Sequence, residues 1–293
     1  MYNILQPIKM KIHSINTGNF KLDGGAMFGV VPKSLWNRTN PSDNNNMCDW
    51  SMRSLIIEQD NQLILIDTGI GNKQDEKFFS HFFLSETDKF DKHLNDLGYS
   101  KNDFTDIILT HLHFDHCGGA VEWNKNKTGY IPSFQNANYW STENHWEWAT
   151  NPNPREKASF LKENILPIEE SGQLKFIKRS SDYSNEVFNN IDILFVDGHT
   201  ESMMLPHIKH KEKTIVFMAD LIPSVGHIPL PYVMGYDTRP LITMTEKEKF
   251  LIEAANKKYI LFFEHDSVNE CCTVKHTDKG VRIDEIFKFN DLF

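Results

Sequence analysis

The stretch THLHFDHCGGA, residues 110–120, decides how this chain folds and what it binds. It places three histidines and an aspartate within six positions, directly after an apolar run. Imidazole nitrogens and carboxylate oxygens are ligands for divalent metals such as zinc. His111 and His113 are two residues apart, so in an extended turn they can point the same way, whereas Asp115 and His116 are expected on the other side as the chain turns. Two ligand clusters side by side predict two metal ions.

Five apolar runs end in a residue that can bind or support a metal. The carboxyl ends of strands in a helix-flanked sheet are where sites assemble, so we expect these residues to meet at one edge. His199 is predicted as a ligand of the first metal, His265 as a ligand of the second, and Asp220 as a carboxylate that bridges both. Asp67 is predicted to orient a ligand histidine through its other ring nitrogen. The runs and their final residues are LILI with Asp67, DIILT with His111, ILFVDG with His199, TIVFMA with Asp220 and YILFFE with His265.

Other residues near these motifs are expected to have ordinary roles. Gly118 and Gly119 predict a tight turn beneath the site. The cysteines are too few and too irregularly spaced for a disulfide framework or a zinc knuckle, so we expect reduced thiols. They are Cys48, Cys117, Cys271 and Cys272. Four further histidines are not expected to be ligands, namely His145, His207, His210 and His227.

The alternation of short β-type runs with helix-like stretches is typical of an α/β protein. With 40% hydrophobic residues, the chain can bury one large core, and we expect a single domain over residues 1–293. A capping box of Thr245 and Glu248 predicts that a helix starts there, and another helix is predicted to end near Gly98. The aromatic segment Tyr139–Trp148 predicts a helix that packs its tryptophans, with a substrate-lining role as the alternative.

Charge and hydropathy exclude some partners. The chain has 40 acidic and 31 basic residues and a net charge of -9, so it lacks the basic surface that nucleic acids require. The N-terminus shows no signal-peptide pattern, and no run approaches the roughly 18 apolar residues of a membrane span. We expect a cytoplasmic protein with neither a nucleic-acid nor a membrane partner.

The ligand pattern resembles that of the metallo-β-lactamase-fold hydrolases. The stretches LIDTGIG, THLHFDHCGG and DGHT follow one another in the order found in that family. The resemblance implies an αβ/βα sandwich, two mixed β-sheets flanked by helices, with a dinuclear metal site at one edge. The family signature HxHxDH followed by H, D and H is matched by His111, His113, Asp115, His116, His199, Asp220 and His265.

Within that superfamily, two segments resemble quorum-quenching N-acyl homoserine lactonases and the methyl parathion hydrolase group. They are FKLDGGAMFGVVPKSLW, residues 20–36, and YWSTENHWEWATNPNPREKASFL, residues 139–161. The lactonase resemblance implies that a metal-bridging hydroxide opens the lactone ring and that Asp115 passes a proton to the departing ring oxygen. It implies two divalent ions, with zinc the first choice and iron, cobalt or manganese as alternatives. The implied partner is then a small lactone or ester, and the resemblance leaves a homodimer as one alternative for the oligomeric state.

One departure from the lactonase pattern keeps other substrates open. Many such lactonases have a tyrosine three residues after the bridging aspartate, where this chain has Pro223. Either Tyr232 or Tyr236 replaces that hydroxyl, or the substrate is a phosphotriester or another ester. A noncatalytic metal-binding domain is the third alternative, and the complete ligand set argues against it. Candidate side chains around the substrate are Met27, Phe28, Trp36, Phe114, Ile222 and Tyr232.

Overall fold

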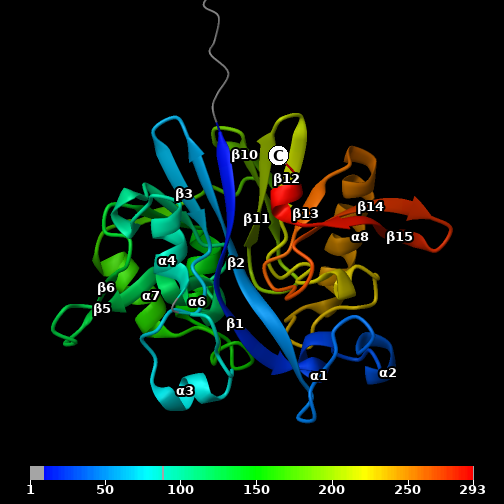
Figure 1. Cartoon of the computed structure of the whole chain (residues 1–293), viewed down its shortest axis with the longest axis horizontal. Helices are drawn as coiled ribbons and strands as arrows, with labels where there is room; N and C mark the ends of the chain where they lie inside the picture. The colour runs from blue at the N-terminus through cyan, green and yellow to red at the C-terminus, as the bar shows by residue number, and fades with distance from the viewer. Residues whose placement is uncertain (1–9, 88, 293) are drawn as a thin grey trace, which may run out of the picture.

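Two β-sheets pack face to face in the computed structural model, which describes residues 10–87 and 89–292 (Figure 1). Within that range the first sheet has six strands in the order β1-β2-β3-β4-β7-β8: β1 (Lys11–Asp23), β2 (Met47–Gln59), β3 (Gln62–Ile66), β4 (Asp106–Ile108), β7 (Asn138–Ser141) and β8 (Leu174–Phe176). The second has seven in the order β15-β14-β13-β12-β11-β10-β9: β9 (Tyr183–Phe188), β10 (Ile191–Val196), β11 (Met203–His210), β12 (Lys213–Phe217), β13 (Ile260–Phe262), β14 (Cys271–Thr277) and β15 (Gly280–Phe287).

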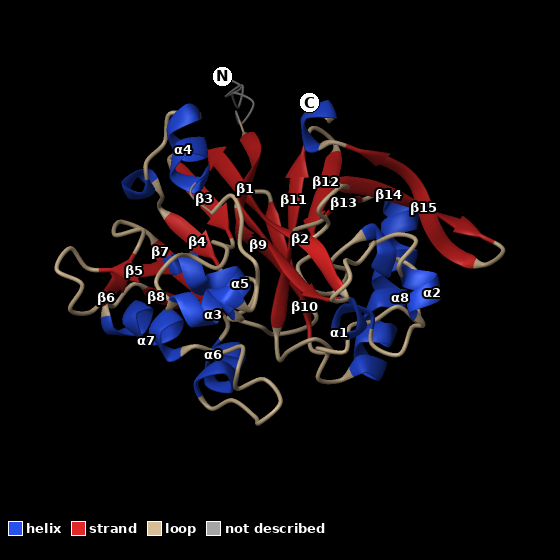
Figure 2. Ribbon diagram, turned by 60° about the horizontal axis from the view of Figure 1, so that its bottom comes forward, coloured by secondary structure: helices blue, strands red, loops and turns tan. Residues whose placement is uncertain are grey.

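Both sheets are mixed, and helices flank them on the outside (Figure 2). The strands β3, β4, β7 and β8 pair in parallel, as do β12 and β13, whereas the other neighbours are antiparallel. The helices α4 (Lys89–Asp96), α6 (Glu143–Thr150) and α7 (Lys162–Glu170) lie outside the first sheet, and α8 (Pro240–Lys257) lies outside the second. The predicted αβ/βα sandwich is therefore confirmed.

Shorter elements lie in the connections. They are the helices α1 (Gly24–Phe28), α2 (Lys33–Trp36), α3 (Glu76–Ser80) and α5 (Phe114–Cys117), the hairpin of β5 (Val121–Trp123) and β6 (Tyr130–Pro132), and single 3-10 turns. No helix within the described residues is long and apolar enough to cross a membrane.

The two faces of the first sheet bury different side chains. Leu55 and Ile57 of β2 point into the sandwich, where they join Ile193 in the core between the sheets. Ile56 points to the opposite face and packs in the cluster that contains Leu94 of α4. Successive side chains of a strand alternate between its faces, so a run that is apolar throughout is buried on both sides. This explains why the central strands β2, β3 and β4 contain continuous apolar runs.

The predicted start of α8 is wrong. The helix begins at Pro240, and Thr245 lies inside it with its hydroxyl donating to the carbonyl oxygen of Leu241 at 3.1 Å. Proline at the first helical position has a backbone angle suited to the helix and needs no amide partner there. The proline therefore marks the start, and the apparent capping box is a helix-internal pair.

Two other local predictions have different outcomes. The helix predicted to end near Gly98 is confirmed, because α4 ends at Asp96 and Gly98 has a positive φ of 85°. The helix predicted for Tyr139–Trp148 is correct only in its second half. Tyr139 and Trp140 lie in β7, and α6 begins at Glu143.

Candidate metal centre

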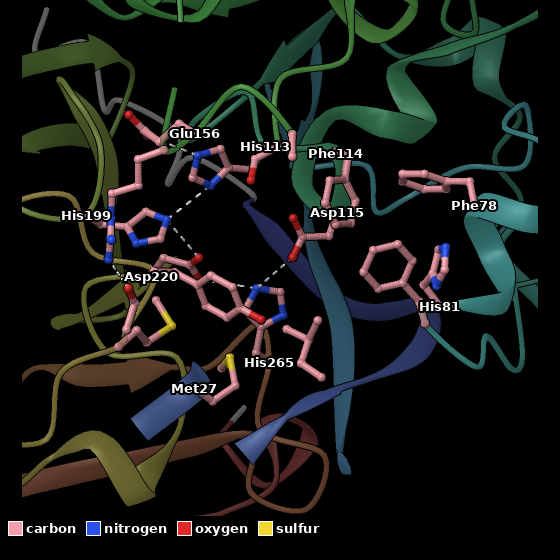
Figure 3. A pocket seen from close by; sticks show the side chains of 18 residues that line it. Met27, Phe78, His81, His113, Phe114, Asp115, Glu156, His199, Asp220 and His265 are labelled. Carbon is pink, nitrogen blue, oxygen red and sulfur yellow. Dashed lines mark hydrogen bonds and ion pairs between the residues drawn. The ribbon is translucent and has the colours of Figure 1, made fainter. Parts of the chain in front are cut away.

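Seven side chains proposed as metal ligands meet at one edge of the sandwich; His113, Asp115, His199, Asp220 and His265 are labelled in Figure 3. The first sheet and the helix that follows β4 supply four of them, and loops of the second sheet supply the other three. Each side chain comes after a strand end, so the topology brings together residues that are far apart in sequence. His111 follows β4, His113 caps α5, Asp115 and His116 lie within α5, His199 follows β10, Asp220 follows β12 and His265 follows β13.

The first ligand group consists of His111, His113, His199 and Asp220. Their ligand atoms all lie within 4.8 Å of one another, and all four residues are buried. Nδ1 of His113 is 3.0 Å from Nε2 of His111 and 3.2 Å from Nε2 of His199. Oδ2 of Asp220 is 3.1 Å from Nε2 of His199. Three imidazoles and a carboxylate oxygen thus converge on one point.

The second ligand group consists of Asp115, His116 and His265. The two Nε2 atoms are 3.1 Å apart, and Oδ2 of Asp115 is 3.7 Å from each of them. The other carboxylate oxygen of Asp220, Oδ1, is 3.2 Å from Nε2 of His265. Asp220 therefore lies between the two groups: Oδ1 faces His265, and Oδ2 faces His199 and is also 3.6 Å from Nε2 of His116.

The outer contacts of the second group fit a bound cation. Nδ1 of His116 faces Oδ2 of Asp67 at 3.0 Å, and Nδ1 of His265 faces the carbonyl oxygen of Ser51 at 2.8 Å. A carboxylate and a carbonyl only accept hydrogen bonds, so each Nδ1 carries the hydrogen. In the neutral rings both Nε2 atoms then present lone pairs to each other, an arrangement that a cation between them stabilises.

In the first group, His199 and His111 likewise carry their ring hydrogen on Nδ1, away from the cluster. Nδ1 of His199 faces Oδ1 of Asp237 at 2.9 Å and therefore carries the hydrogen. The Thr110 hydroxyl donates to Asp67 at 2.6 Å, so it accepts from Nδ1 of His111 at 3.1 Å. The Nε2 lone pairs of both rings point inward. Five imidazoles and two carboxylates thus fit two divalent ions, and these ligand types suit zinc as well as iron, cobalt or manganese.

The Asp220 carboxylate raises the pKa of two of the ligand histidines. Its Oδ1 is buried and faces Nε2 of His265 at 3.2 Å. Burial opposes a charge on the neighbouring imidazoles, but the carboxylate outweighs it and raises the pKa of His199 to about 10 and that of His265 to about 9. A metal ion has to displace such protons, so its binding depends on pH.

The predicted glycine turn packs directly against the loop after β3. A Cβ atom on Gly118 would lie 2.1 Å from the carbonyl oxygen of Ile70, and one on Gly119 would lie 2.2 Å from that of Thr68. No side chain fits at either position. The close approach brings Asp67 to His116 and thereby accounts for the outer contact predicted for this aspartate.

A cavity of about 480 Å³ opens beside the ligands. Its floor contains five of them, and one wall is apolar (Figure 3). The floor residues are His113, Asp115, His199, Asp220 and His265, and the apolar lining is formed by Leu22, Met27, Phe78, Phe82, Phe114 and Met234. Such a combination of an apolar wall and convergent polar groups is typical of small-molecule sites.

Only part of the predicted substrate pocket lines this cavity. Met27 and Phe114 do so. Phe28 instead stacks on Trp36 with ring centroids 5.2 Å apart, and both side chains are fully buried. Four candidates do not line the cavity and instead belong to the hydrophobic core or pack against it, namely Phe28, Trp36, Ile222 and Tyr232.

Two aromatic lining residues, Phe78 and Phe82, are absent from the sequence-based site, whereas Tyr236 is one of the two tyrosines that the sequence offers in place of the hydroxyl lacking at Pro223. Phe78 and Phe82 come from the stretch KFFSHFFL, residues 77–84, whose density of aromatics is a signal for a hydrophobic wall. Tyr236 lines the cavity, and partial burial together with the Asp115 carboxylate raises the pKa of its phenol to about 12. Its hydroxyl therefore stays protonated and able to donate.

A family model described as the metallo-beta-lactamase superfamily matches residues 53–265. The chain belongs to the metallo-β-lactamase superfamily. The resemblance in the motifs is thereby confirmed, and the protein is a metal-dependent hydrolase of that superfamily.

Relatives within the metallo-β-lactamase superfamily include named lactonases. An N-acyl homoserine lactonase of Bacillus cereus is 25% identical over 238 residues, which cover 77% of this chain and 85% of the relative. The structure of a probable metal-dependent hydrolase from Staphylococcus aureus is 29% identical, with a TM-score of 0.85 over 95% of this chain and 96% of that one. A dizinc quorum-quenching lactonase solved with a product has a TM-score of 0.75 at 22% identity over 96% of both chains, a likeness of fold alone.

Proposed function

We propose that this protein opens the lactone ring of N-acyl homoserine lactones with two divalent metal ions. The observation that carries the proposal is the cavity itself, in which the ligand cluster forms the floor and an apolar wall stands beside it. A lactone head group fits over the ligands while an acyl chain lies along Met27, Phe82 and Phe114. The Bacillus relatives named as lactonases support the same substrate class.

In this proposal the ligands divide into two sets. His111, His113 and His199 would hold the first ion, Asp115, His116 and His265 would hold the second, and Asp220 would supply a carboxylate oxygen to each. When bound, the two ions supply Lewis acidity for the ester carbonyl and lower the pKa of a water molecule. Zinc is the first choice, and iron, cobalt and manganese are the alternatives.

The chain's own residues then orient the substrate and move the proton. Water adds to the ring carbonyl carbon and gives a proton to Asp115, the ring C–O bond breaks, and the departing oxygen takes that proton. Asp115 lines the cavity and is placed to pass that proton. Tyr236 offers a protonated hydroxyl to the substrate carbonyl, the role that a different tyrosine has in the resembled lactonases and that Pro223 cannot take.

Phosphotriester or other ester hydrolysis is the second candidate, and Pro223 is the observation that favours it. The parathion-hydrolase group also lacks the tyrosine at this position. The same cluster can bind a phosphoryl oxygen in place of a carbonyl oxygen, and the apolar wall can pack an aromatic leaving group.

One side-by-side assay distinguishes the two. Purified protein of known metal content is given a long-chain N-acyl homoserine lactone and, separately, paraoxon or methyl parathion. We expect kcat/KM to be higher for the lactone. The opposite ranking would assign the protein to phosphotriesters, and inactivity on both would overturn both proposals while leaving the metal centre to be tested by metal content.

A further inference from the structure

Glu156 is a buried carboxylate beside the first ligand group (Figure 3). It lies in the loop between α6 and α7, and only 3% of it is exposed, although Arg155 and Lys157 on either side are exposed. Burying a carboxylate is costly unless hydrogen-bond donors surround it. The donors around Glu156 therefore indicate its role.

The two oxygens of Glu156 have different partners. Oε2 accepts from Nε1 of Trp148 at 2.7 Å and from Nδ2 of Asn153 at 2.6 Å. Oε1 faces Nε2 of His113 at 3.3 Å. Because a carboxylate only accepts, Nε2 of His113 carries the hydrogen. Its Nδ1 is left with a lone pair, and this lone pair points at the other ligands of the first group.

His113 differs in this respect from the four other ligand histidines. Those four turn Nε2 toward the cluster and keep their outer contacts on Nδ1, whereas His113 turns Nδ1 inward. It therefore needs the opposite tautomer. A neutral imidazole adopts either one unless a partner selects it, and here the selecting partner is Glu156.

Trp148, which donates a hydrogen bond to Glu156, also contacts an arginine that binds the loop carrying His199. The guanidinium of Arg239 lies 4.9 Å from the centre of a Trp148 ring. The same guanidinium donates to the carbonyl oxygen of Asp197 at 2.6 Å, in the turn that leads to His199. Arg239 thus contacts both the Trp148 indole, which binds Glu156, and the loop that carries His199, another ligand of the first group.

We propose that Glu156 is a positioning residue that selects the His113 tautomer able to bind the first metal ion through Nδ1. The inference rests on the proposed metal centre and not on the identity of the substrate. A carboxylate that hydrogen-bonds a ligand histidine sets both its tautomer and its ring orientation.

The test is Glu156→Gln in zinc-loaded protein. Two donors, Trp148 and Asn153, hold the side-chain oxygen, so the new amide group faces Nε2 of His113 and favours the other tautomer. Nδ1 then carries a hydrogen toward the cluster. We expect one of the two zinc ions to bind roughly 10- to 100-fold more weakly in competition with a chromogenic chelator. The matched control is Glu147→Gln, the same change at an exposed site beside Trp148.

A double variant separates positioning from a general structural effect. If Glu156 acts through His113, adding Glu156→Gln to His113→Ala causes no further loss of zinc affinity. An equal loss in both backgrounds, or wild-type affinity in Glu156→Gln, would overturn the inference. If Glu156→Gln does not fold, Trp148→Phe removes one donor to the carboxylate, and unchanged zinc affinity there counts against the inference. Wild-type protein that holds fewer than two ions would overturn the metal centre together with the inference.

Discussion

Replacing Asp67 by asparagine is expected to weaken both the fold and the second metal site. Asp67 is fully buried and accepts from the backbone amide of Thr110 at 2.7 Å, from the hydroxyl of Thr110 at 2.6 Å and from Nδ1 of His116 at 3.0 Å. Its φ is 57°, a left-handed value that asparagine tolerates. The substitution therefore changes the charge and the acceptors of the side chain while adding little backbone strain.

The size of the effect follows from those three donors. The asparagine side chain has only one acceptor oxygen. Its nitrogen therefore takes the place either of Oδ1, which faces the Thr110 amide, or of Oδ2, which faces both the Thr110 hydroxyl and His116. A hydrogen bond to a charged group contributes about 1.5–3 kcal/mol, and we expect the free energy of unfolding of metal-free protein to fall by about 2 kcal/mol. If the amide nitrogen faces His116, Nδ1 of that ring keeps the Glu264 carboxylate, whose Oε2 is 3.0 Å away, as its remaining acceptor, and we expect zinc at the second group to bind roughly 10-fold more weakly.

Urea denaturation of metal-free protein measures the first quantity, and chelator competition measures the second. Asp278→Asn, at an exposed position in the turn between β14 and β15, is the matched control and should change neither. If Asp67→Asn kept both the stability and the zinc affinity of the wild type, Asp67 would have no orienting role.

Three further outcomes are expected. Asp220→Ala should lower kcat about 10³-fold, since about 4 kcal/mol of metal-dependent stabilisation at 1.36 kcal/mol per tenfold is lost; steady-state kinetics that match the wild type would remove it from the site. Tyr236→Phe should lower kcat/KM for the lactone roughly tenfold, the value of one hydrogen bond, with zinc content unchanged. Acidification from pH 8 to 6 should weaken zinc binding, because the pKa values of His199 and His265, about 10 and about 9, keep protons on the ligands throughout that range. Calorimetry at several pH values should give roughly a tenfold loss per pH unit for each displaced proton, and a flat profile would contradict this.

The strands and the ligand cluster can be predicted from the sequence because both depend on local patterns. Apolar runs of strand length that end in His or Asp specify the sheet and its functional edge together. The HxHxDH spacing then determines which side chains point to which group. Asp220, far from that motif, is identifiable by its position after an apolar run, and the structure places it between the two groups.

The cavity lining and the outer contacts of the ligands depend on packing between distant loops. Phe28 and Trp36 look suitable for a substrate wall, but they stack on each other in the core because α1 and α2 fold back on β2. Glu156 gives no signal in its own loop. Its role depends on Trp148 and His113, and only the folded chain brings these residues together.

The division of the ligands between the two sheets also sets an order of events during synthesis. His265 follows His116 by 149 residues, and their Nε2 atoms are 3.1 Å apart in the folded chain. A nascent chain that has just exposed HLHFDH to solvent holds a cluster of histidines with no partners from the second sheet. The second ligand group is completed only after His265 has left the ribosome. In the proposed metal centre, the second ion therefore finds its full set of ligands only after His265 has been synthesised.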